Sequence, residues 1–186
     1  MISFFAYAPY EAAPAVGTNK GIVLSGKTDK GIPFIDFTLK DATKLTEMVD
    51  LVVADQHDQK YSENSGTVNF KFGHILSKVL FKVKLKNALS GNTRIFVKKL
   101  EILGTTNNGT SKFYTKAEYK NQHWQYDAAN IPATDFDVAN IMNVAAVSGV
   151  GDYTKTAIEA TTSAKSLFKD GEFLFLIPVN DSETPG

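Results

Sequence analysis

The stretch that decides the fold class reads Lys78-Val79-Leu80-Phe81-Lys82-Val83-Lys84-Leu85-Lys86. Apolar side chains occupy every second position from Val79 to Leu85, and lysines occupy most positions between them. Because successive side chains of a strand point to opposite faces, this period of two predicts a strand with one face in a core and a lysine face in solvent. We expect Phe81→Ala to cost about 3–5 kcal/mol of stability and Lys82→Ala to stay within about 0.5 kcal/mol.

Further strands are predicted on both sides of this one. The clearest spans residues 68–72, where Val68, Phe70 and Phe72 alternate with polar residues, and it is expected to be half-exposed and antiparallel. Apolar runs bounded by turn residues predict buried strands over residues 2–10 and 50–55. The same reasoning predicts strands over residues 21–26, 34–39, 94–104 and 172–179.

The remaining segments are expected to be turns and connections. Turns are predicted at residues 29–31, at 107–110, where Asn-Gly accepts positive φ, and between Tyr114 and Trp124, with a bulge at 98–99. A short helix or loop is expected over residues 41–48, and a long connection over 127–166 with one short helix near 138–147.

Short strands without regular helices between them favour an all-β fold, an antiparallel β-sandwich. No repeat and no clean linker divides the chain, so residues 1–186 are expected to form a single domain.

Composition excludes several classes of function. The 20 basic and 20 acidic residues balance, and Arg94 is the only arginine, so we expect no nucleic-acid partner. The absence of cysteine excludes disulfides, thiolate metal sites and cysteine nucleophiles. No apolar run approaches the roughly 20 residues that a membrane-spanning helix needs.

The three histidines give little support for an active site or a metal site. His57 lies between Asp55 and Asp58, a set that could bind a divalent metal, but a solvated loop is favoured because such spacing is common. His74 is expected to form a local bond, and His123 is expected to be exposed. We therefore predict no enzymatic activity, no catalytic residue, no cofactor and no metal.

Two short motifs add nothing to this assessment. Residues 149–152 read Gly-Val-Gly-Asp, which lacks the third glycine and the strand-to-helix context of a phosphate-binding turn. Asn108 and Asn180 begin glycan-acceptor patterns that matter only in a eukaryotic secretory route.

Aromatic residues near the hairpin suggest one binding alternative. Tyr114, Tyr119, Trp124 and Tyr126 could stack on sugar rings, although core packing is favoured. Trp124, Tyr126 and Tyr119 are accordingly the candidate contacts for a glycan or a protein partner.

Two adjacent blocks carry a family resemblance. The first is Val49-Asp50-Leu51-Val52-Val53-Ala54, and the second runs through Phe72-Gly73-His74-Ile75-Leu76-Ser77-Lys78 into the alternating strand. With the opening Phe4-Phe5-Ala6-Tyr7-Ala8-Pro9-Tyr10 and the closing Phe173-Leu174-Phe175-Leu176-Ile177-Pro178, they are similar to the fimbrillin-like family of Bacteroidetes, which includes Mfa-like surface and pilus subunits.

The resemblance implies a structural role at the cell surface. Proteins of this family are exported as lipoproteins, and many are pilus subunits with two transthyretin-like Greek-key β-sandwich domains that join when a strand of one subunit fills a groove in its neighbour. The chain is thus expected to be the N-terminal domain of a longer fimbrial subunit or adhesin, associated with the outer membrane through a lipid anchor outside this chain. Expected partners are other fimbrial subunits and a host or bacterial surface glycan or protein; a surface glycan-binding module is the alternative function.

Overall fold

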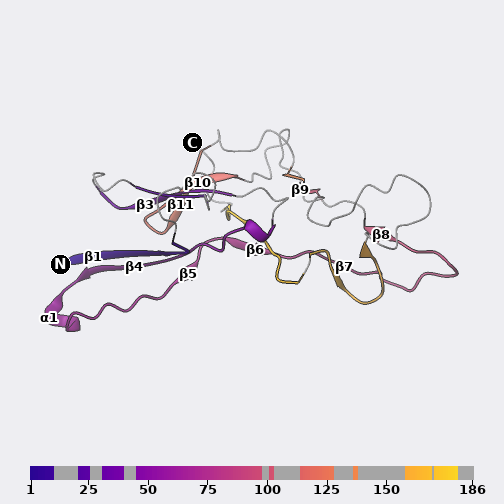
Figure 1. Cartoon of the computed structure of the whole chain (residues 1–186), viewed down its shortest axis with the longest axis horizontal. Helices are drawn as coiled ribbons and strands as arrows, with labels where there is room; N and C mark the ends of the chain where they lie inside the picture. Colours follow the sequence, from indigo (N-terminus) through magenta and orange to yellow (C-terminus); the bar gives the residue numbers. More distant parts are fainter. Residues whose placement is uncertain are drawn as a thin grey trace.

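The computed structural model of the chain describes residues 1–10, 21–25, 31–39, 45–97, 101–102, 114–127, 136–137, 158–168 and 170–179. These residues form an elongated molecule whose regular secondary structure is almost entirely strand (Figure 1). The two largest sheets lie toward the end that carries the N-terminus, and short strand pairs extend toward the other end.

The strands, in chain order, are β1 (Ile2–Ala8), β2 (Ile22–Leu24), β3 (Phe34–Thr38), β4 (Val52–Gln59), β5 (Gly73–His74), β6 (Ser77–Val79), β7 (Lys82–Val83), β8 (Phe96–Val97), β9 (Glu101–Ile102), β10 (Lys116–Lys120), β11 (His123–Tyr126), β12 (Phe136–Asp137), β13 (Ile158–Glu159), β14 (Lys165–Ser166) and β15 (Leu174–Leu176). Helical structure in the described residues is limited to the 3-10 turn η1 (Leu45–Glu47) and the single turn α1 (Tyr61–Asn64). No helix among these residues has the length and apolar character needed to cross a membrane.

Every strand pairing among the described residues is antiparallel. One sheet has the order β1-β4-β5 and the other the order β11-β10-β3-β2, so neighbours in space are often distant in the chain. Four two-stranded ladders complete the fold, and each joins a strand between β6 and β9 to one between β12 and β15. The all-β antiparallel class predicted from the sequence is confirmed, whereas the transthyretin-like Greek-key connectivity stays a prediction.

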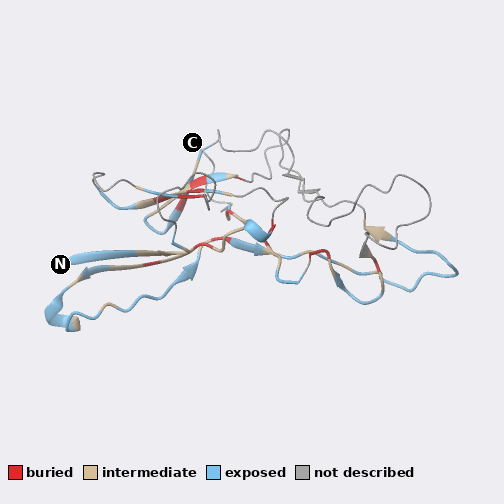
Figure 2. Cartoon of the chain, viewed as in Figure 1, coloured by how far each residue is buried: buried red, intermediate tan, exposed pale blue. Residues whose placement is uncertain are grey.

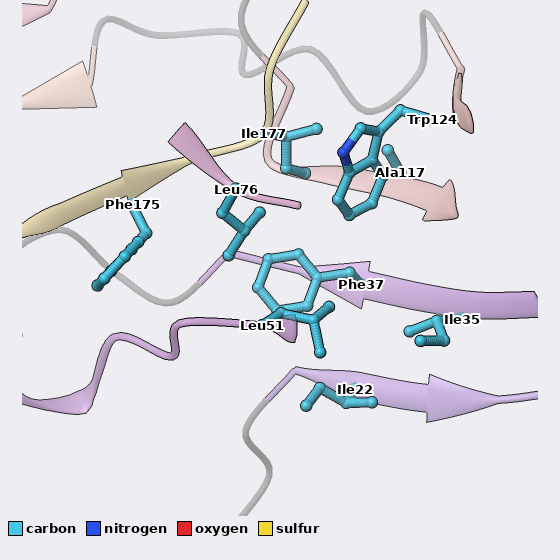
Figure 3. Close-up of a cluster of buried hydrophobic side chains, with 9 residues drawn as sticks. All are labelled: Ile22, Ile35, Phe37, Leu51, Leu76, Ala117, Trp124, Phe175 and Ile177. Carbon is cyan, nitrogen blue, oxygen red and sulfur yellow. The ribbon is translucent and has the colours of Figure 1, made fainter. Parts of the chain in front are cut away.

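The main core holds the two large sheets together (Figure 3). Phe37 on β3 is 2% exposed and Leu51, just before β4, is fully buried, and both belong to one cluster. The cluster consists of Ile22, Ile35, Phe37, Leu51, Leu76, Ala117, Trp124, Phe175 and Ile177. Buried residues concentrate where these elements meet, while the long connection from β7 to β8 is largely exposed (Figure 2).

The alternation predicted for residues 78–86 is visible in the structure. Val79, Phe81, Val83 and Leu85 are half-buried and the residues between them are exposed. The predicted continuous strand is nevertheless divided into β6 and β7, which pair with β15 and β14. Phe81 packs edge-on against Phe168 at the margin of a second, smaller core of Leu45, Phe168 and Leu174, and is only half-buried.

Three predictions about strands are wrong in part. Residues 68–72 form no strand, and the rings of Phe70 and Phe72 lie 6.3 Å apart at 37% and 47% exposure, because the strand expected to neighbour them pairs elsewhere. β1 is a strand but not a buried one, since its first half is exposed. The segment of residues 55–59 is not a loop: β4 continues to Gln59 because β1 pairs along its length.

Other expected elements are found with different limits. Strands appear within residues 21–26, 34–39, 94–104 and 172–179 as predicted, and the expected helix or loop near residue 45 is η1. The predicted connection over residues 127–166 contains β12, β13 and part of β14. The bulge at 98–99, the turn at 107–110, the helix near 138–147, the motif at 149–152 and both glycan-acceptor asparagines lie outside the described residues.

Candidate functional site

A cavity of about 450 Å³ opens between the two large sheets, and it is the candidate site of this chain. We call it the inter-sheet groove. β1 and β4 line one side, and β2, β3 and β10 line the other. Its size lies within the range of ligand-binding clefts.

The walls of the groove are mainly apolar. Phe5, Leu24 and Ile32 lie toward solvent with exposures of 43%, 47% and 42%, while Ile35 belongs to the buried core. The remaining apolar and small wall residues are Ala6, Tyr7, Gly31, Pro33, Phe34, Val53, Ala54 and Tyr119. An exposed apolar surface of this kind indicates a contact region. Covering it with an apolar group of a partner removes apolar area from water, which is favourable in free energy.

A polar cluster lies at one side of the groove. Asp55 Oδ2 on β4 lies 2.6 Å from His57 Nε2 and accepts a hydrogen bond of 2.8 Å from Gln122 Nε2. Gln122 belongs to the two-residue turn between β10 and β11, so this hydrogen bond joins the two large sheets beside the groove. Asn121 and Gln122 have φ of 51° and 65°, the left-handed backbone that a tight antiparallel hairpin requires.

The charges of this cluster follow from its contacts. The hydrogen bond from Gln122, together with that from His57, holds the pKa of Asp55 below its usual range despite partial burial. Burial, helped by the nearby Asp55 charge, raises the pKa of Tyr119. At neutral pH the groove therefore has one carboxylate, and the neighbouring phenol is neutral.

His57 lies at the irregularity in the β1–β4 pairing, between the paired residues Gln56 and Gln59. The centroids of the His57 and Phe5 rings lie 5.4 Å apart in an edge-on arrangement. At the same irregularity Asp58 adopts φ of 53°, and its backbone N–H donates to Ser3 Oγ at 3.2 Å. Within the part of the chain that the structure describes, no group of three or more His, Asp or Glu side chains gathers as metal ligands would.

The other two histidines lie outside the groove. His74 Nδ1 lies 2.8 Å from Asp50 Oδ1, so His74 does bond, but to a residue 24 positions away instead of locally, and both groups are at the surface or partly exposed. His123 begins β11 and is exposed, as predicted. Within the described residues, His74 has Asp50 as its one ion-pair partner, and His123 forms no ion pair.

The aromatic residues proposed as contacts are divided between the core and the groove. Trp124 is 7% exposed, and its indole N–H donates to the Ile75 carbonyl at 2.9 Å. Tyr126 is half-buried, stacks on the buried Tyr114 at 4.7 Å, and donates its hydroxyl proton to the Pro178 carbonyl. Tyr119 alone of the candidate contacts lines the groove. The structure thus brings Tyr119 toward the site and places Trp124 in the core.

Sequence reasoning missed most of the groove. Its walls on β1 and β3 were assigned to strands without a function, because a pattern of alternation says which face is apolar but not which face stays uncovered. One signal was available: residues 1–10 contain no charged side chain, which is unusual for a strand at the edge of a sheet.

Comparison with known proteins gives a consistent result. A family model described as fimbrillin-like matches residues 1–178. A fimbrium subunit, Fim1C, from Phocaeicola vulgatus is 39% identical over 191 residues, covering 97% of this chain and 49% of the relative. The crystal structure of a fimbrial protein from Bacteroides vulgatus superposes with a TM-score of 0.75 at 37% identity, covering 95% of this chain and 54% of that one.

The chain thus spans about half the length of the relatives it matches. The structural match covers nearly the whole of this chain. The resemblance noted in the sequence is confirmed: this chain belongs to the fimbrillin-like family.

Proposed function

We propose that this chain is part of a non-enzymatic fimbrial subunit at the cell surface, and that the whole protein assembles with other fimbrial subunits by β-strand addition. The observation that carries this proposal is the inter-sheet groove, an apolar cavity of about 450 Å³ bordered by β1, in a member of a fimbrillin-like family. An extended strand from a neighbouring subunit would supply main-chain hydrogen bonds and place alternate side chains in the groove.

The walls of the groove suit such a strand better than they suit a substrate. Apolar residues dominate, and the one carboxylate, Asp55, is already bonded to His57 and Gln122. A hydrolytic or transfer reaction would require a nucleophile or base aimed at a reacting atom, together with groups that stabilise developing charge. These considerations support a structural role.

The setting of the chain in the whole protein is also a proposal. We infer that residues 1–186 form one β-sandwich domain and that it is the N-terminal part of a longer subunit; the greater length is supported by relatives about twice as long. Export as a lipoprotein and attachment to the outer membrane through a lipid anchor outside this chain fit a surface role of this kind.

Glycan binding is the second candidate function. The residue that favours it is Tyr119, whose ring lines the groove near Asp55 and Lys120, an aromatic surface with polar neighbours. The burial of Trp124 and the hydrogen bond of Tyr126 argue that those two residues serve the core. Loss of glycan-array binding on Tyr119→Ala would support this function, and an absence of binding by the unmodified chain would refute it.

Strand addition is tested with two neighbouring substitutions in the full-length subunit. Leu24 lines the groove and Val23, on the other face of β2, does not, although both are about half-exposed. Leu24→Asp places a carboxylate in the apolar cavity, so polymer formation should fall at least about a hundredfold. Val23→Asp, the matched control, should assemble normally.

Filaments are counted by electron microscopy, and assembly is followed by light scattering. Circular dichroism establishes that both variants are folded. Equal assembly by the two variants would refute the groove as the acceptor of a strand, and a full-length subunit that stays monomeric under all conditions would refute assembly itself.

A further inference from the structure

The hairpin that joins β4 to β5 is paired only near β5. Its ladder includes the Ile75 N–H, which donates to the Leu51 carbonyl, and it ends at the pair of Val53 with Gly73. Residues 68–72 continue toward α1 on the side of β4 that faces away from β1 (Figure 1). No main-chain hydrogen bond joins this segment to another described residue. The hairpin is therefore open on the α1 side of Gly73.

The register of the paired part continues directly into the open part. Because Val53 lies opposite Gly73, the next residues of the two arms would face each other in turn. The resulting pairs are Ala54 with Phe72, Asp55 with Lys71, and Gln56 with Phe70. β4 is regular up to Gln56, since the irregularity in its pairing with β1 lies beyond that residue. The free edge of β4 is thus in register to receive the segment.

We propose that residues 70–72 close onto this edge of β4, so that the chain exchanges between an open and a closed hairpin. In the closed hairpin Phe72 faces Ala54, a large side chain beside a small one. Phe70 and Phe72 share one face of the segment and are 37% and 47% exposed in the open hairpin. Packing the two rings against β4 removes apolar area from water, which favours closure.

The charged pair also favours closure. Lys71 is exposed and forms no ion pair among the described residues, and Asp55 carries the carboxylate of the inter-sheet groove. Residues directly opposite each other point to the same face of a sheet, and opposite charges there attract. Closure therefore brings a lysine cation to the carboxylate that Gln122 already holds. The contact forms at the edge of β4 away from β1, so this inference does not rest on the proposed assembly.

Hydrogen exchange of single amides in the unmodified chain tests closure. Ile75 and Leu51 are a hydrogen-bonded pair, and such pairs alternate along an antiparallel ladder with pairs that are not hydrogen-bonded. The Lys71 N–H should therefore bond to β4, while the N–H groups of Phe70 and Phe72 point to solvent. After correction for intrinsic rates, the Lys71 amide should exchange about tenfold or more slowly than its two neighbours. Equal exchange at the three amides would overturn the proposal.

A disulfide tests the register. The chain has no cysteine, so Gln56→Cys with Phe70→Cys introduces two thiols at a pair whose Cβ atoms would lie about 4.5–5.5 Å apart in the closed hairpin. Gln56→Cys with Asn69→Cys is the matched control, because Asn69 is also exposed but points to the other face. In dilute protein with oxidised glutathione, the first pair should form an intramolecular disulfide about tenfold faster than the control. Equal rates in folded variants would contradict the register.

The charge at residue 71 gives a third measurement in the same cross-linking variant. Lys71→Glu sets a second carboxylate opposite Asp55, so disulfide formation between the thiols at residues 56 and 70 should slow about fivefold. Lys71→Gln, which removes the charge without reversing it, should have an intermediate rate. Circular dichroism verifies that each variant is folded. A rate that is the same with lysine, glutamine and glutamate at this position would show that Asp55 does not face residue 71.

Discussion

Phe37→Ala should be among the most destabilising single substitutions in this chain. The side chain lies on β3, between two paired strands, is 2% exposed, and is surrounded by the main core, with the Trp124 ring 6.1 Å away (Figure 3). Burial of a phenylalanine side chain contributes about 1.5–3 kcal/mol, the aromatic pair adds about 0.5–1.5 kcal/mol, and the cavity left behind adds a further penalty. A loss of about 3–5 kcal/mol of unfolding free energy is therefore expected.

The chain supplies both a reporter and a matched control for this measurement. Trp124 is the only tryptophan and is buried against Phe37, so its fluorescence reports unfolding in urea. Phe72→Ala removes the same group from a site that is 47% exposed and should cost about 1 kcal/mol or less. For a chain of this length the Phe37 variant should also melt roughly 6–20 °C lower. Equal losses for the two variants would refute the assignment of Phe37 to the core.

Three other substitutions test separate parts of the fold. Trp124→Phe should cost about 1–3 kcal/mol, because it leaves the Ile75 carbonyl without its donor, and urea unfolding followed by circular dichroism measures this loss. The lowered pKa of Asp55, caused first by Gln122, stabilises the fold above the ordinary aspartate pKa of about 3.9, and this stabilisation is lost as pH falls through the lowered value. Asp55→Asn should flatten that acid limb of the stability curve, and an unchanged curve would contradict the assignment. Phe81→Ala should cost about 2 kcal/mol, below the range expected from the sequence, since the side chain is only half-buried; a loss equal to that of Phe37→Ala would contradict this.

The groove also explains why aspartate substitutions at two neighbouring residues of β2 are expected to affect assembly differently. Val23 and Leu24 are similarly exposed, but alternation along the strand sends only Leu24 into the inter-sheet groove. Exposure by itself would not separate them. The predicted contrast between their aspartate variants therefore depends on the tertiary arrangement of the sheets.

The class of fold and the faces of the strands were determined by the sequence alone. Alternation from Val79 to Leu85 reappears as alternating burial, because a period of two is a property of the extended backbone and needs no knowledge of neighbours. The blocks around Leu51 and His74 were also identified from the sequence. In the structure they lie together, since Leu51 and Leu76 belong to one core and His74 bonds to Asp50.

Which strands pair, and which apolar faces are covered, were decided by the tertiary structure. Residues 68–72 have the same alternation as a strand yet remain unpaired, whereas residues 55–59 look like a polar loop yet form β4, because β1 pairs along them. The indole N–H of Trp124 is polar, so this side chain could have faced solvent. The Ile75 carbonyl accepts a hydrogen bond from that N–H inside the core. The inter-sheet groove requires β1 and β2 to stand at edges of different sheets. Local pattern determines which face of a strand is apolar, and only long-range contacts determine what covers that face.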